Sequence, residues 1–183
     1  MRTVLLLAAI VGTPAHADEV NRYDPAAVVT LGPRASVSAS LLREPYVVTD
    51  GTAQLSIEAR IDERMNLRIE AGGSPFRSRV HAAGALRVYP MGKARAAWWA
   101  EISAHVQRTG FRDRPGEWVP LTARGWISLP TMFGGGWRVF LGELVVLDLG
   151  AHVGPTLDVR TLDISGVGLG LAATGHLTIG SSF

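Results

Sequence analysis

The chain of 183 residues contains no cysteine and only one lysine, Lys93. The lack of cysteine excludes disulfide bonds, thiol catalysis, cysteine-ligated zinc and a lipid anchor attached through cysteine. The formal net charge is only +2 and no basic tract occurs, so the charge pattern gives no support to nucleic-acid binding. No P-loop, dinucleotide fingerprint or G-x-S-x-G motif stands in a strand–turn–helix context.

The sequence also lacks an apolar run of the roughly 20 residues that a membrane-spanning helix needs. A shorter run, Val4–Val11, follows the basic Arg2 and precedes Ala15-His16-Ala17. This order predicts a secretory signal peptide over residues 1–17, cleaved after Ala17. Residues 18–183 are then expected to form a single domain, because 47% hydrophobic residues suffice for a folded core.

What the sequence does contain is alternation. In "AQLSIEARIDERMNLRIEA", residues 53–71, every second side chain is apolar, with the exception of Glu63, and those between are polar or charged. A period of two predicts β-strands with one apolar face. The alternation continues unbroken through residues 62–64, which predicts a three-residue turn that pairs Ile61 with Met65.

The same rhythm recurs along the chain and predicts eight strands. The sixth is interrupted by Pro130 and by Gly134–Gly136, so its boundaries stay open between a short and a long version. Longer links are expected at 43–51, 72–78, 108–118 and 155–164, and they alternate with short turns. The expected strands are 27–42, 53–61, 65–71, 80–88, 95–107, 119–129 (extending to 140 in the long version), 144–154 and 166–183.

Alternation alone does not say which face is inside, because a soluble lipocalin-like barrel and a membrane barrel give the same pattern. Three further features favour a membrane barrel. The strands are about ten residues long, which suits a tilted spanning strand. Charges of both signs share the polar face, as expected of a narrow lumen: Arg34, Glu58, Arg60, Arg68, Glu70, Arg79, Arg87, Glu101, Arg124 and Asp148. Aromatic residues near strand ends predict an interfacial girdle: Tyr89, Trp98, Trp118, Trp126 and Trp137.

The signal peptide, the even strand number, the alternating links and a last strand "HLTIGSSF" together resemble the small eight-stranded outer-membrane barrels of the OmpA/OmpX/OmpW-like superfamily. The resemblance implies an all-β, eight-stranded, antiparallel up-and-down transmembrane β-barrel in the outer membrane, with the longer links outside. It implies contact with outer-membrane lipids and with the barrel-assembly machinery. Leu177, Ile179 and Phe183 resemble the C-terminal assembly signal of that class, although Ser181 stands where an aromatic residue is commoner.

The interior of an eight-stranded barrel is just wide enough to be filled by side chains. We therefore interpret the charged lumen as a packed structural network in a protein with a structural or surface-interaction role, without catalytic, cofactor or metal sites. The longer links would contact an extracellular ligand. The best candidate is 108–118, where arginines accompany aromatic residues: Arg108, Phe111, Arg112 and Arg114.

Three alternatives remain open at the level of sequence. They are a narrow pore for small solutes, a soluble periplasmic lipocalin-like barrel that binds a ligand, and a lipid-modifying enzyme. Resemblance to a lipid A deacylase barrel would imply a His-x-Ser pair on the outer face with an acidic partner, whereas His176-Leu177-Thr178 offers threonine and lies on the polar face. The histidines form no cluster with ligand spacing, so lumenal hydrogen bonds are expected of them.

Overall fold

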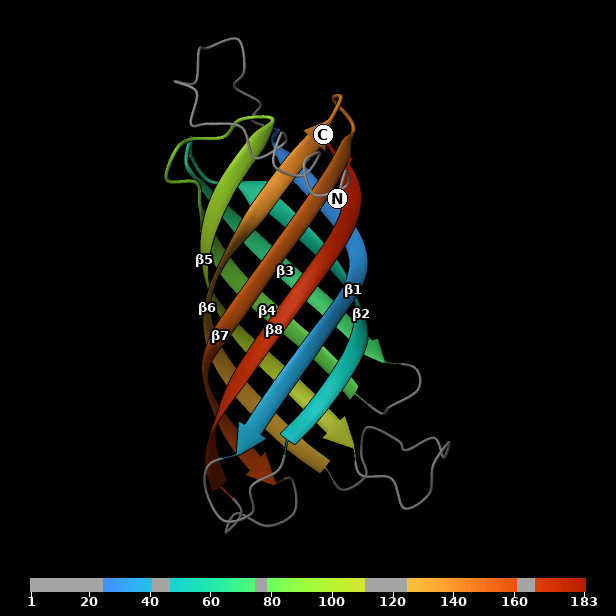
Figure 1. Cartoon of the computed structure of the whole chain (residues 1–183), viewed down its shortest axis with the longest axis vertical. Coiled ribbons are helices and arrows are strands. Elements are labelled where there is room, and N and C mark those ends of the chain that lie inside the picture. The colour runs from blue at the N-terminus through green and yellow to red at the C-terminus, as the bar shows by residue number, and fades with distance from the viewer. Residues whose placement is uncertain (1–24, 41–46, 75–78, 111–124, 161–166) are drawn as a thin grey trace, which may run out of the picture.

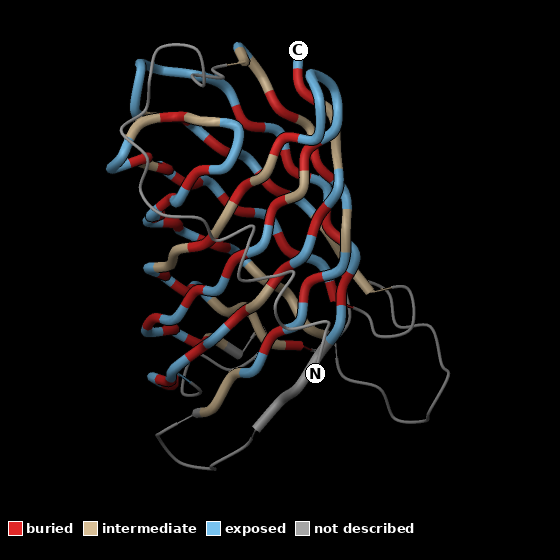
Figure 2. The backbone as a smooth tube through the Cα atoms, turned by 45° about the horizontal axis from the view of Figure 1, so that its top comes forward, coloured by how far each residue is buried: buried red, intermediate tan, exposed pale blue. Residues whose placement is uncertain are grey.

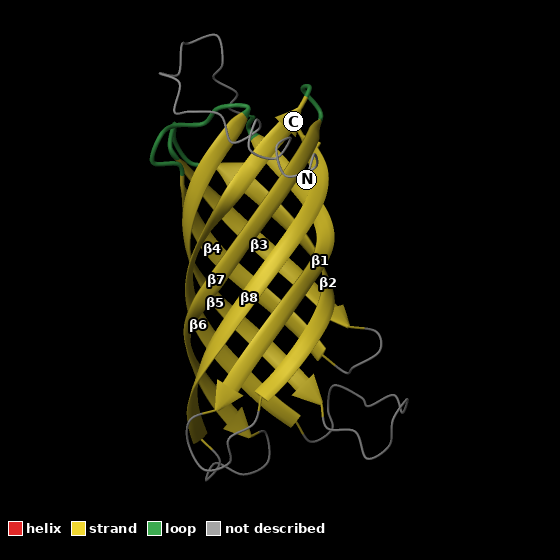
Figure 3. Cartoon of the chain, in the orientation of Figure 1, coloured by secondary structure: helices red, strands yellow, loops and turns green. Residues whose placement is uncertain are grey.

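Eight antiparallel strands close into a barrel in the computed structural model, which describes residues 25–40, 47–74, 79–110, 125–160 and 167–183 (Figure 1). Each strand pairs with the next, and β1 pairs with β8 to complete the ring. The predicted fold class and strand number are confirmed. The described residues contain no helix (Figure 3), and none therefore crosses a membrane in helical form. The strands are β1 (Ala27–Ser40), β2 (Val47–Arg60), β3 (Met65–Ser74), β4 (Arg79–Val88), β5 (Ala96–Gly110), β6 (Gly125–Leu141), β7 (Val145–Arg160) and β8 (Val167–Ser182).

Four strands extend into segments that the sequence assigned to links. β3 runs to Ser74 and β5 to Gly110, and the longest extensions are in β2 and β7. β2 already begins at Val47, and β7 continues through Pro155 to Arg160. The predicted links 43–51 and 155–164 were therefore too long. Backbone pairing decides the difference: Val47 pairs with Ala39, and Thr156 pairs with Gly170, so the long neighbouring strands satisfy the backbone there. β6 follows the long version of the prediction, without a break at Pro130 or the glycines.

The short connections gather at one end of the barrel, which we call the turn end, and the opposite end is the loop end (Figure 1). The predicted three-residue turn is confirmed, because the Ile61 amide donates to the Met65 carbonyl at 2.9 Å. The Asp62 carboxylate accepts from the amides of Arg64 and Met65 at 2.6 and 2.7 Å. The other two turns contain Gly92 and Gly142, both with positive φ, a conformation that glycine adopts without a steric cost.

The register shows how steeply the strands are staggered. A path from Ala27 through directly paired residues returns to β1 at Val37, ten residues further along, and a large stagger of this kind accompanies strongly tilted strands. The path runs through Ala59, Leu67, Leu86, Ile102, Phe133, Val153 and Ala173. The stagger brings side chains from distant strands to the same height inside the barrel.

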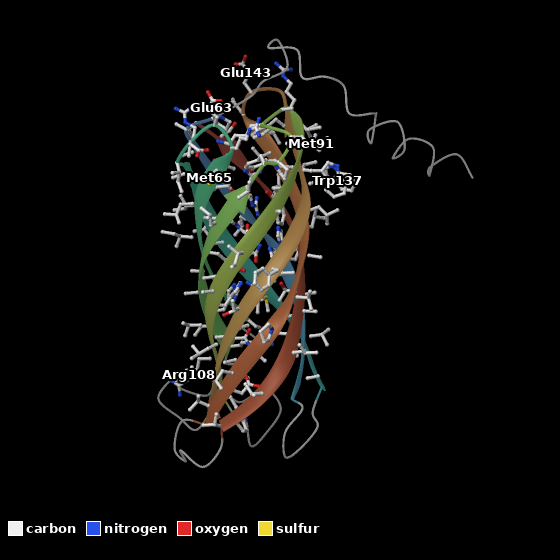
Figure 4. All side chains as sticks on the ribbon, turned by 90° about the vertical axis from the view of Figure 1, so that its left-hand side faces the viewer. Glu63, Met65, Met91, Arg108, Trp137 and Glu143 are labelled. Carbon is white, nitrogen blue, oxygen red and sulfur yellow. The ribbon has the colours of Figure 1, made fainter. Side chains whose placement is uncertain are left out.

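The faces of the barrel are inverted relative to a water-soluble protein. Buried and exposed residues alternate along every strand (Figure 2), and the buried ones are mostly polar. Gln54 and Glu58 are 0% and 1% exposed, whereas Ile69 is 61% exposed. Nitrogen and oxygen atoms therefore fill the interior while carbon covers the outside (Figure 4). Small apolar clusters occur inside near the turn end, where Val28, Phe140 and Val146 pack together.

Candidate functional site: the charged lumen

Eight buried ionised side chains form one connected group, which we call the lumen network. Alternation along the strands turns all of them inward, and four guanidinium groups balance four carboxylates. The members are Arg34, Glu58, Arg68, Glu70, Arg87, Glu101, Arg138 and Asp148. Seven of them were predicted from the sequence to line the lumen, and Arg138 was not.

At the turn end of the network two arginines share two carboxylates. Arg138 on β6 reaches across the lumen to Glu58 on β2 through two bonds, Nη1 to Oε1 at 2.8 Å and Nη2 to Oε2 at 2.7 Å. Its Nε also donates to Asp148 Oδ2 at 2.8 Å. Arg87 Nη1 contacts the same Asp148 oxygen at 2.6 Å and Glu58 Oε2 at 3.1 Å. Fork-shaped guanidinium groups suit such shared, bidentate pairing.

Toward the loop end the pairing continues without a gap. Glu101 accepts from Arg87 Nε at 2.8 Å and lies 3.2 Å from Arg68 Nη1. Arg68 Nη2 then reaches Glu70 Oε2 at 2.7 Å, and Arg34 contacts the other oxygen of Glu70. Each carboxylate therefore meets at least two cationic partners, so the charges are balanced as a unit rather than pair by pair.

An aromatic group completes the network. The Trp99 side chain, 2% exposed, lies under Arg87, whose guanidinium carbon is 3.8 Å from the ring centroid. His176 stacks on the indole with centroids 5.9 Å apart, and its Nε2 bonds to Asp148 at 3.1 Å. A Cβ atom at Gly150 would lie 2.4 Å from the Trp99 ring. Glycine is therefore required opposite the indole, and a cation–π contact adds to the packing.

Solved structures of two outer-membrane proteins are similar to this barrel. Neisserial surface protein A is 10% identical and has a TM-score of 0.59, with 86% of this chain and 97% of that one covered. The outer membrane protein OprG from Pseudomonas aeruginosa is 12% identical, with a TM-score of 0.57 and 88% and 98% coverage. The fold is that of small outer-membrane β-barrels. No family model and no curated protein matches the sequence.

The prediction that Tyr89 belongs to the outer aromatic girdle is wrong. The sequence placed it on the outside because it lies near a strand end, but it is buried in the interior. Its position two residues after Arg87 gives it the inward parity, and its hydroxyl donates to Glu58 Oε1 at 2.9 Å. A buried phenol needs such a partner, and the lumen supplies it while lipid would not.

The prediction that Arg60 lines the lumen is also wrong. It has the same parity as Glu58, but it is the last residue of β2 and its side chain is exposed. At the rim, the inward direction no longer leads into a closed interior, so the side chain reaches solvent. Arg79 is buried near the loop end, as the parity predicts, whereas Arg124 lies outside the described residues.

The remaining aromatic positions are divided between the two faces of the barrel. Trp98 and Trp137 lie against each other on the outside, with ring centroids 3.4 Å apart, and Figure 4 shows Trp137 near the turn end. Trp126 is half-buried near the loop end. Trp118 lies outside the described residues. Trp126 has the same parity as the inward-facing Met132 and Arg138, so it also departs from the predicted girdle. Within the described residues, the outward girdle positions are thus Trp98 and Trp137, near the turn end.

Other predicted residues are placed as follows. Leu177, Ile179 and Phe183 point outward on or just after β8, with Phe183 72% exposed. Arg108 is half-buried at the loop end (Figure 4). The signal peptide 1–17 and the loop residues Phe111, Arg112 and Arg114 lie outside the described residues. Among the residues with described positions, no group of three histidine, aspartate or glutamate side chains could hold a metal ion.

Sequence reasoning missed two members of the site, Arg138 and Trp99. Arg138 follows the glycine run of β6, where the strand boundary was open, so no parity was assigned to it. Trp99 lies on the same polar face as Glu101, and this position in the sequence could have indicated that its side chain is inside the barrel. A large aromatic residue on a polar face, opposite strands with glycine, indicates that the ring fills the interior.

Proposed function

We propose that this protein resides in the outer membrane as a closed, non-conducting barrel with a structural or surface-interaction role. The observation that carries the proposal is the inversion of the faces: a charge-balanced, mutually paired lumen inside an apolar outer surface. Closed barrels are one of only two architectures that satisfy every backbone polar group in a bilayer.

The outer surface supports the membrane location. Large apolar side chains are exposed on every strand, for example Leu55, Ile102 and Leu177. An apolar surface of this extent would aggregate in water, but it suits contact with outer-membrane lipids. The soluble ligand-carrying alternative needs the opposite arrangement, and the inner face holds arginines and carboxylates instead. Export by the signal peptide 1–17, and recognition of Leu177, Ile179 and Phe183 by the assembly machinery, belong to the same proposal.

Cross-lumen pairs argue against the pore alternative. Arg138 on β6 bonds to Glu58 on β2, and Arg87 on β4 bonds to Asp148 on β7. These contacts join opposite walls and occupy the path that a solute would take. Separating one such pair would leave uncompensated buried charges, at a cost of about 3–5 kcal/mol.

The position of His176 supports a non-enzymatic role. A lipid-modifying site would need its histidine on the outer face, where the substrate lies. His176 instead points into the lumen and bonds to Asp148, and Thr178 is buried on the same face. We assign the external contact to segment 108–118, of which Arg108 is at the loop end.

A semi-native gel of the outer-membrane fraction, combined with planar-bilayer recordings, tests the proposal. A closed membrane barrel is expected to migrate differently before and after boiling and to give no conductance steps. Migration without a shift, or recovery in the soluble fraction without detergent, would contradict the membrane barrel. Reproducible single-channel steps would contradict the closed lumen and favour the pore.

A further inference from the structure

One part of the lumen lies outside the charge network and has unpaired polar atoms. Gln54 on β2 is fully buried, and neither its amide nitrogen nor its carbonyl oxygen has a hydrogen-bond partner in the protein. The hydroxyl of Thr178 on β8 is also buried and unpaired. Leaving a buried polar group unsatisfied costs about 1–3 kcal/mol, so three such atoms in one region require an explanation.

The backbone brings these two side chains to one place. Gly32 on β1 pairs directly with Gln54, and a Cβ atom at Gly32 would lie 2.7 Å from the Thr178 Cα atom. Gly32 therefore separates the two residues without placing a side chain between them. On the other side of Gln54, its β3 partner is Gly72, also without a side chain. The His81 ring covers Gly72, since a Cβ atom there would lie 2.5 Å from it, so the position without a side chain beside Gln54 is the one at Gly32, toward Thr178.

The region is bounded along the strands by side chains that are already paired. Toward the loop end, the next inward residue after Gly32 is Arg34, which is paired with Glu70. Toward the turn end, the next inward residues are Thr30 and Ser56, whose hydroxyl oxygens are hydrogen-bonded at 2.7 Å. Beside Thr178, its β7 partner in register is Asp148, a member of the shared arginine–carboxylate cluster. The unpaired atoms themselves are neutral donors and acceptors, and they would not attract a free ion into this space.

We propose that Gln54 and Thr178 form an internal binding site for water, holding at least two ordered molecules between β8, β1 and β2. A carboxamide offers two donors and one acceptor, and the hydroxyl offers both functions, so bridging water molecules satisfy all of them. Water is the ligand because the unpaired atoms are neutral donors and acceptors, and the side chains that bound the region along the strands, Arg34 with Glu70 and Thr30 with Ser56, are already paired. Buried waters of this kind typically make about three hydrogen bonds to polar groups that would otherwise be unsatisfied.

Water–protein cross-relaxation measured by NMR tests this site on the ¹⁵N-labelled full barrel in detergent micelles. The Gln54 side-chain amide protons are expected to show cross-peaks to water with the sign of long-lived binding. The Arg138 Nε proton, which is equally buried but bonded to Asp148, is the internal control and is expected to show none. Absence of the Gln54 cross-peaks would overturn the proposal.

Two variants test whether Gln54 and Thr178 bind the same water molecules or are hydrated independently. Thr178→Val, which keeps the shape of the side chain, is expected to reduce the Gln54 cross-peaks at least twofold because one anchor is lost. Ser56→Ala is the matched control, since the Ser56 hydroxyl is already paired with Thr30 at 2.7 Å. Equal cross-peaks in wild type and Thr178→Val would show that the two residues do not share bound water, and the proposed site would be wrong.

Discussion

Trp99 can occupy the lumen because neighbouring strands carry glycine where its indole ring lies. Cβ atoms at Gly136 and at Gly150 would each come within 2.4 Å of the ring. Arg87 covers the ring, and the ring in turn backs the histidine that bonds to Asp148. The glycines therefore contribute to the charge network indirectly, through the position of one aromatic side chain.

Gly150→Ala is expected to lower the free energy of unfolding by about 1–3 kcal/mol, because the new methyl group overlaps Trp99 and His176. Urea titration of the refolded barrel, followed by tryptophan fluorescence, measures the change. Gly84→Ala is the matched control, since nothing lies within 4 Å of a Cβ atom there. Equal stability of the two variants would contradict the packing assigned to Trp99.

Arg138→Met is expected to destabilise the barrel by about 3–5 kcal/mol, because Glu58 and Asp148 each lose a cationic partner inside the lumen. The double variant Arg138→Met with Glu58→Gln should recover part of the loss, since it removes one of the uncompensated charges. The same urea titration measures both. Arg95→Gln, at an exposed position, should change stability by less than about 0.5 kcal/mol. A loss for Arg138→Met no larger than for Arg95→Gln would argue against the network.

At the scale of the strands, each strand has an apolar face on the outside of the barrel and a polar face on the inside. The interior of β6 tolerates Pro130 because β7 pairs with it there, while the pairing with β5 skips Leu129 and Pro130 and resumes on either side; the glycine run is paired with both neighbours. Extended pairing also explains why β2 and β7 are longer than predicted. Local turn-forming residues such as Pro155 indicated links, but the pairing partners outweighed them.

Arginine on the outer face should destabilise the barrel according to its height in the membrane. Ile69→Arg, in the middle of β3, is expected to cost about 2–4 kcal/mol, and Leu144→Arg, in the turn after β6, about 0–1 kcal/mol. The two positions are equally accessible, at 61% and 65%, so exposure does not separate them. Folding equilibria in lipid vesicles measure the difference. Equal, small effects would indicate that the apolar face does not contact lipid.

At the scale of the whole molecule, closure of the ring makes the strands interdependent, so deletions within a strand and between strands are expected to differ. β5 ends at Gly110 and β6 begins at Gly125. Deleting residues 111–117 is therefore expected to leave the heat-dependent gel shift intact. Deleting 103–109, an equal length within β5, should abolish the shift because the ring opens. Loss of the shift in the first variant would show that the segment is needed for folding.

The sequence by itself determined the strands, their number and the residues that share a face. These properties are local, because an extended backbone places alternate side chains on opposite sides whatever surrounds it. The same local rule correctly put seven members of the lumen network on one face. It could not assign Arg138, which follows the glycine run, and proximity to a strand end misplaced Tyr89.

The tertiary structure decided which groups meet. Glu58 and Arg138 are 80 residues apart, and they bond because the staggered ring places β2 and β6 at one height across the lumen. The same closure brings Gly150 opposite Trp99 and leaves Arg60 at the open rim. Such contacts depend on the register of all eight strands together, and no spacing within a single strand encodes them.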